Sequence, residues 1–189
     1  MTAEKFYGGC LRVSPVFWWE LEELSARFDA SLIAGAVRCK FGGVKVLVCR
    51  PFSRKLRPFP TTFWLACPHL SHLAGTLESN GGVRELEGVI ADLHEWRRYN
   101  MLHQKLRLGL MSGEERKFMF RHNTKIFRSV MRSGVGGIKQ TDRVNVKCLH
   151  LQAASFIALG RHPGGEWLRA NGLCSECSAG HSCCRSCSP

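Results

Sequence analysis

The chain has 189 residues, of which 44% are apolar and 10% aromatic, so we expect one domain with a sizeable core. It contains no run of about 18 apolar residues, which excludes a transmembrane helix, and it lacks the start of a secretory signal, so we expect a cytoplasmic protein whose ten cysteines stay reduced. Lys and Arg outnumber Asp and Glu by 27 to 15, and the net charge of +12 suits RNA or another polyanion as partner, with an ordinary solvated basic surface as the alternative.

The first part of the chain predicts a helix followed by a hairpin. Residues 15–28 repeat apolar side chains at helical spacing, with Ser14 as N-cap and Pro15 at the first helical position. Two short apolar runs, 31–37 and 44–48, flank a Gly-Gly turn and predict two antiparallel strands.

A third strand is predicted at residues 61–66, after a basic connection. Its residues are β-branched, aromatic or small, which favours a short strand buried on both faces. Pro60 and Pro68 bound it, because proline cannot donate a ladder hydrogen bond. The strand would therefore hold Cys67 and His69 in a fixed place at its end.

The remainder of the chain predicts helices. Their expected ranges are 69–79, 83–110, 112–132 and 144–159, with a short turn at 166–169. Ser112 and Glu115 form the pattern of a capping box. The fold class is thus α+β: a mostly helical single domain over residues 1–170 with a small sheet of about three strands, followed by a Cys-rich tail at 171–189.

One predicted helix carries a basic ridge. On a helical wheel of residues 112–132, five cations fall within an arc of about 80°: Lys117, Arg121, Lys125, Arg128 and Arg132. The far side is apolar, with Met119, Ile126, Phe127 and Val130. This ridge would bind the phosphates of RNA or another polyanion without reading bases, and the alternative is a solvated face.

The tail contains two C-x-x-C pairs, Cys174/Cys177 and Cys184/Cys187. This spacing lets both thiolates of a pair bind one tetrahedral ion. The six residues between the pairs are too few for a zinc ribbon and do not fit a bacterial ferredoxin. A metal site formed with the tail is therefore predicted, and a redox-exposed tail is the alternative.

Cys39, Cys67 and Cys148 are further candidate ligands within the domain, although a single cysteine is by default a small core residue. Cys39 lies in the predicted turn, and Cys148 lies two residues before His150. If this segment is helical from residue 146, Cys148 and His150 point about 200° apart and cannot share one ion. If the helix starts after His150, both can contribute.

A glycine-rich loop precedes the last long helix. Gly136 and Gly137, with Arg143 and Lys147, could bind a phosphate at the helix N-terminus. A loop that needs positive φ at its glycines is the alternative, because a short glycine run is a weak signal.

Several segments together resemble a bacterial family catalogued as domain of unknown function 501. The segments are Arg38-Cys39-x-x-Gly42, Pro58-Phe59-Pro60-Thr61, Leu65-x-Cys67-Pro68, Gly136-Gly137 and Val146-Lys147-Cys148-Leu149-His150. The resemblance covers the chain from about residue 36. Family members often have histidine where Cys67 stands, which implies a ligand role there. The chain departs from the family pattern at Phe41, which replaces a second cysteine, and at His162-Pro163-Gly164.

Three functions follow as hypotheses. The first is a zinc-binding, non-enzymatic protein that uses Cys39, Cys67 and Cys148 with Cys174 or Cys177, and that carries its basic surface toward RNA. The second is an iron–sulfur protein, since four thiolates suit a cluster equally well. The third is a thiol-dependent enzyme that pairs Cys67 or Cys148 with His69 or His150.

Overall fold

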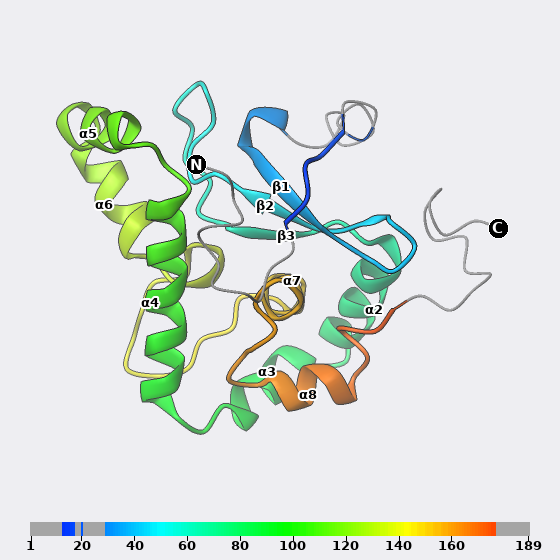
Figure 1. The fold of residues 1–189 in the computed structure, drawn as a ribbon. Coiled ribbons are helices and arrows are strands. Elements are labelled where there is room, and N and C mark those ends of the chain that lie inside the picture. Colours follow the sequence, from blue (N-terminus) through cyan, green and yellow to red (C-terminus); the bar gives the residue numbers. More distant parts are fainter. Residues whose placement is uncertain (1–12, 18–19, 21–28, 177–189) are drawn as a thin grey trace.

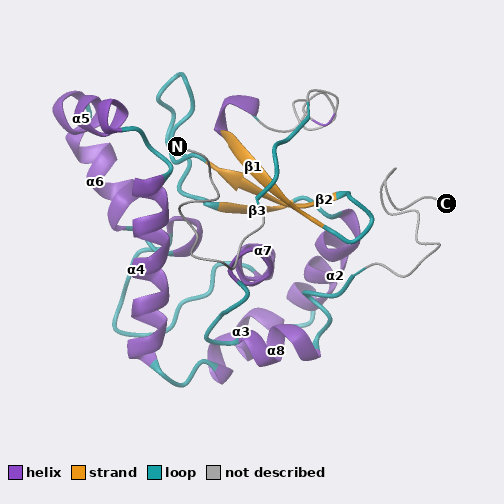
Figure 2. Ribbon diagram, viewed as in Figure 1, coloured by secondary structure: helices purple, strands orange, loops and turns teal. Residues whose placement is uncertain are grey.

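The computed structural model describes residues 13–17, 20 and 29–176. Three strands are present: β1 (Ile33–Arg38), β2 (Val44–Cys49) and β3 (Phe63–Leu65). The described helices are α2 (Pro68–Ser79), α3 (Gly82–Val89), α4 (Leu93–Gly109), α5 (Gly113–His122), α6 (Thr124–Arg132), α7 (Leu149–Leu159) and α8 (Gly165–Ala170). Two short 3-10 turns, η2 (Ala30–Leu32) and η3 (Val135–Gly137), complete them. The predicted mostly helical α+β class is confirmed (Figures 1 and 2).

The sheet is antiparallel with the strand order β1-β2-β3. The turn of the β1–β2 hairpin lies at the predicted Gly-Gly pair, with Gly42 at φ +86°. Side chains of β2 and β3 alternate: Val46 and Leu65 belong to the main core, whereas Leu47 and Trp64, which pair with each other, face the other side. Trp64 is 42% exposed, so the prediction that this strand is buried on both faces was wrong.

Helix α7 lies at the centre of the molecule. In the view of Figure 1 the sheet lies above it, α4, α5 and α6 lie to its left, α2 lies to its right, and α3 and α8 lie below it. Strand β3 and helix α2 make its most extensive contacts, and nearly all of its residues are buried. Because α7 is apolar all round, it can only be stable with neighbours on every side. None of the described helices has the length and apolar character needed to cross a membrane.

Two of the predicted helices are each divided in two. The range 83–110 breaks after Val89, and Asp92 caps α4 by accepting hydrogen bonds from the N–H groups of His94 and Glu95. The range 112–132 breaks at Asn123, which has non-helical backbone angles (φ −139°, ψ 43°). The predicted capping box of Ser112 and Glu115 is confirmed at the start of α5.

Two predicted helix starts were wrong. Helix α7 begins at Leu149 and not at Val144, because Cys148 is fully extended (φ −162°, ψ 157°). Ser14 does not cap a helix but pairs with Ala36 beside β1, and residues 15–17 are not helical. Most of the remaining predicted helix, to residue 28, lies outside the described residues.

Candidate metal centre

Three side chains with metal-ligating atoms converge where α2 ends and α7 begins. Glu78 lies in the last turn of α2, Cys148 immediately precedes α7, and His150 lies in its first turn. One ligand atom from each lies within 4.8 Å of the other two. All three residues are partly buried, so the cluster is accessible from solvent at one side.

Glu78 is held in this cluster because it caps helix α7. Its Oε1 accepts hydrogen bonds from the backbone N–H groups of Leu149 (2.5 Å) and His150 (3.3 Å). The same oxygen lies 2.9 Å from Nδ1 of the His150 ring. The Cys148 side chain makes no capping bond, so a carboxylate from another helix satisfies the N-terminus of α7. Capping therefore explains why Glu78 and His150 meet.

The structure has a geometry between the two that the sequence left open, because α7 begins at Leu149, after an extended Cys148 and before His150. Cys148 stands outside the helix, so the angle between helical positions i and i+2 does not apply to it. Its sulfur and the His150 ring consequently reach the same place. His150, a predicted ligand that helical geometry disfavoured, is thus brought to Cys148.

The thiol of Cys148 is neutral in its present surroundings. Burial raises its pKa, and the carboxylate of Glu78 acts in the same direction, whereas the backbone N–H of Leu151 and the ammonium group of Lys147 oppose them. A thiol with a raised pKa is a weak nucleophile at neutral pH.

A cavity of about 570 Å³ adjoins the cluster. Lys147, Cys148 and His150, which belong to one segment of the chain, are among the residues that line it. Its other walls are mainly apolar and come from β2, β3, and the first turns of α2 and α7. The volume falls in the range of about 300–1,000 Å³ usual for ligand pockets.

The other predicted thiol ligands lie elsewhere. Cys39 is in the β1–β2 turn, Cys67 is buried before α2, and Cys174 follows α8. Within the described part of the chain, none of these three joins a group of three or more ligand atoms within 4.8 Å, so Cys39, Cys67 and Cys148 do not converge. Cys177 and the Cys184/Cys187 pair lie outside the described residues.

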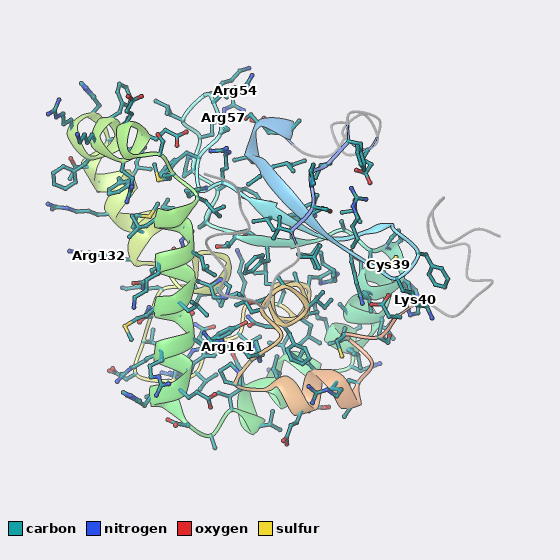
Figure 3. All side chains as sticks on the ribbon, viewed as in Figure 1. Cys39, Lys40, Arg54, Arg57, Arg132 and Arg161 are labelled. Atoms are coloured by element: carbon teal, nitrogen blue, oxygen red, sulfur yellow. The ribbon has the colours of Figure 1, made fainter. Side chains whose placement is uncertain are left out.

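The start of the tail is fastened to the hairpin. The side chain of Lys45 is only 5% exposed, and its Nζ lies 2.6 Å from Glu176 Oε1 and 3.3 Å from the carbonyl oxygen of Cys174. Lys40 lies beside Cys39 at the hairpin tip (Figure 3), and its backbone N–H donates to the other oxygen of Glu176. That the tail completes a metal site stays a prediction.

The five cations of the predicted ridge are all exposed, but they do not share one helix. Lys117 and Arg121 lie on α5, while Lys125, Arg128 and Arg132 lie on α6. The single arc of about 80° was therefore wrong, because the wheel assumed an unbroken helix. Ile126, predicted on the apolar side, is 43% exposed, whereas Met119 and Val130 are buried as expected.

The glycine loop before α7 uses most of its own backbone donors. The N–H groups of Gly134, Val135 and Gly137 donate to protein acceptors, including the side chain of Asn100. Gly136 and Gly137 have φ of +61° and +85°, and a Cβ on Gly136 would collide with Leu151. The glycines thus fit the alternative of a loop with positive φ. Arg143 and Lys147 are exposed, and phosphate binding there stays a prediction.

Glu78 is the member of the cluster that sequence reasoning missed. It lies 72 residues before His150, inside an ordinary helical pattern that ends at Asn80-Gly81-Gly82. No local motif marks it. Only the packing of α2 against α7 brings its carboxylate to the Cys-x-His segment.

Comparison with known proteins identifies a family. The family model described as "Protein of unknown function (DUF501)" matches residues 35–170, which include all three members of the cluster. Neither the curated proteins nor the solved structures contain a match. The chain therefore belongs to the DUF501 family, as the motifs around Cys39, Cys67 and Cys148 predicted.

Proposed function

We propose that this protein binds a zinc ion through Glu78, Cys148 and His150. The observation that supports this is the convergence of a carboxylate oxygen, a sulfur and an imidazole nitrogen within 4.8 Å, from the end of α2 and the start of α7. All three are ordinary zinc ligands.

The ligand set favours an open zinc site over a closed one. Structural zinc usually has four protein ligands, whereas a site with three leaves a position for water or a ligand. The adjoining cavity provides room at that position. Because only one of the three residues is a cysteine, zinc is favoured over an iron–sulfur cluster, which is usually held by four thiolates.

Metal analysis of purified variants tests the proposal. The wild-type protein should bind zinc, and Cys148→Ser should lose one equivalent. Because the tail has its own thiols, the matched control is Cys184→Ser/Cys187→Ser, which should keep the equivalent that Cys148→Ser loses. Unchanged zinc content in Cys148→Ser and His150→Ala would refute the site.

A thiol-dependent enzyme is the second candidate, and one observation favours it. The contact of Glu78 with His150 is the kind of bond that orients a catalytic base next to a nucleophile, and Cys148 is the nearby thiol. The raised pKa of Cys148 argues against it. Alkylation of the metal-free protein by iodoacetamide decides. If Cys148 is a catalytic nucleophile, it should be alkylated faster than Cys39, and its alkylation rate should fall in His150→Ala.

We also propose that the α5–α6 surface binds RNA. This surface comprises the exposed side chains of residues 116–132, which include six cations and no acid. The same surface includes two aromatic rings, Phe118 and Phe120, which are 47% and 52% exposed. Cations with exposed aromatic rings suit single-stranded RNA, because phosphates pair with the former and bases stack on the latter.

A neighbouring loop extends the same basic surface. Arg54, Lys55 and Arg57 are exposed on the connection between β2 and β3, and this loop and α5 line a shared pocket. Arg54 and Arg57 project at the end of the molecule where α5 lies (Figure 3). The exposed cations of the loop would lengthen the path available to a phosphate backbone.

Salt titration of binding to a single-stranded RNA tests this surface. Lys125→Gln/Arg128→Gln should weaken binding and reduce the salt slope by about 1 for each phosphate whose cation is removed. Phe120→Ala should weaken binding with the slope unchanged. The control, Arg84→Gln/Arg98→Gln, removes two exposed cations from other helices, and an equal effect there would contradict a specific surface.

A further inference from the structure

We infer that the cavity beside the metal centre binds a carboxylic acid with an apolar body. This rests on the proposed zinc site, since the carboxylate would occupy the open position of the ion. The cavity, of about 570 Å³, is lined mainly by apolar residues, together with the lysine Lys147. That combination is the recognition pattern for an amphiphilic anion.

The apolar wall is built from side chains on the sheet and on α7. Leu47 and Trp64 come from the sheet face that lies away from the main core, and Leu65 and Leu151 reach the cavity from β3 and α7. Trp64 leaves 42% of its surface exposed here. A hydrocarbon body would cover this surface, at about 25 cal/mol for each Å² of apolar area removed from water.

The polar residues that line the cavity favour an anion. Lys147 lines it next to Cys148 and His150, and none of the described lining residues is acidic. The remaining polar lining residues, Thr61 and Ser71, are neutral donors or acceptors. Glu78 is not among the lining residues.

A carboxylate suits this lining better than a phosphate. Among the described residues, one lysine and no arginine line the cavity, whereas phosphates are typically bound by arginine forks or several donors. A carboxylate oxygen is also an ordinary fourth ligand of zinc. The inferred ligand is therefore a monocarboxylic acid, with its head on the ion and Lys147 and its body against Trp64 and the three leucines.

Calorimetric titration of the full-length protein with decanoate tests the inference. Decanoate should bind the zinc-loaded protein at least about tenfold more tightly than the zinc-free protein, a difference of about 1.4 kcal/mol. Acetate, which lacks the body, and 1-decanol, which lacks the charge, should each bind at least about tenfold more weakly than decanoate.

Two matched tryptophan variants locate the binding site. Ser71 lines the cavity from the first turn of α2, so Ser71→Trp should fill it and weaken decanoate binding at least about tenfold, with zinc content unchanged. His72, the next residue, is exposed and does not line the cavity, so His72→Trp should behave as wild type.

The outcomes separate the two proposals. Zinc bound without decanoate, or equal decanoate binding in Ser71→Trp, would overturn the cavity ligand and leave the zinc site in place. Equal binding with and without zinc would overturn coordination of the carboxylate. A wild-type protein that binds no zinc at Cys148 would overturn both.

Discussion

Helix α7 contributes to two polar sites that both contain histidine but differ in burial. At its N-terminus, His150 is 37% exposed by side chain and meets Glu78 and Cys148 beside a cavity. In its middle, Gln152 and Ser155 are completely buried and meet His103 and His162, which are 1% and 8% exposed.

The buried site is a hydrogen-bonded network that joins α4 to α7. Ser155 Oγ bonds to the Tyr99 hydroxyl and lies 2.7 Å from His103 Nε2. His162 accepts a bond from the N–H of Gly164 at Nδ1, so its Nε2–H donates to Gln152. The Tyr99 ring packs edge-on against both histidines.

Solvent access to the ring separates a structural histidine from a candidate metal ligand. Burial lowers the pKa of His103 and of His162 to about 3, so both are neutral and enclosed. His150 has a carboxylate and a thiol as neighbours and an open cavity beside it. A metal ion can reach only the second kind.

Acid should destabilise the buried site, and this is the largest effect we expect. A histidine with pKa 6.5 when unfolded and about 3 when folded binds more protons in the unfolded state between these values. Stability is therefore full above pH 6.5 and falls as the pH drops below it. From pH 7 to pH 5 each histidine should cost about 2 kcal/mol, measured by urea unfolding.

The variant His162→Gln is the control for this pH effect. It should be less stable at pH 7 but lose about half as much on acidification. An identical loss in the variant and the wild type would show that this histidine does not titrate as its burial implies.

Arg107 is a second buried polar group whose removal should destabilise the fold. It is fully buried on α4 and donates to the backbone carbonyl groups of Pro60, Ser133 and Gly134. Burial lowers its pKa to about 10, so it remains charged at neutral pH. Arg107→Met should cost about 3 kcal/mol, because each buried acceptor left without a donor costs about 1–3 kcal/mol.

The readout for Arg107→Met is the free energy of unfolding, with metal content measured in parallel. Zinc binding per folded molecule should not change, since Arg107 is not part of the cluster. A loss below about 1 kcal/mol would mean that water replaces the guanidinium at these carbonyl groups.

His150→Ala tests the accessible side. Zinc affinity should fall at least about 100-fold, because loss of an outer-shell partner alone typically costs about 10–100-fold. The metal-free protein should lose little stability, since the side chain is more than one-third exposed. Competition with a chromophoric chelator measures the first quantity and urea unfolding with chelator the second. A variant as tight as wild type would remove His150 from the site.

Tyr99→Phe should give the smallest effect, about 1 kcal/mol of stability. The substitution keeps the ring contacts with the two histidines and removes only the hydroxyl that bonds Ser155. Ser155 would keep its bond to His103. Thermal unfolding at pH 7 measures the loss, and a cost above about 3 kcal/mol would mean that the network acts as one unit.

Features with local causes were predictable from the sequence. The hairpin at Gly42 and the capping box of Ser112 and Glu115 depend on residues a few positions apart, and both were predicted correctly. The breaks at Asp92 and Asn123 also have local causes, and a more careful search for N-cap residues within long helical patterns would have found the first.

Features with distant causes were not predictable. The start of α7 depends on Glu78, and the buried position of Arg107 depends on carbonyl groups 26–47 residues away. Two of the three members of the cluster, Cys148 and His150, were predicted from a local motif. The third, Glu78, is brought there only by the packing of α2 against α7. Within the described residues Cys39, Cys67 and Cys148 do not meet, because spacing along the chain carries no information on which turns meet.

The contact between Glu78 and His150 has a topological consequence. It joins residues 72 positions apart, and helices α3, α4, α5 and α6 all lie within that loop. An ion held at both ends would act as a cross-link, which for a loop of this length removes about 4 kcal/mol of chain entropy from the unfolded state. The basic α5–α6 surface lies within this loop. Unfolding of the loop and release of a bound ion would therefore be linked equilibria.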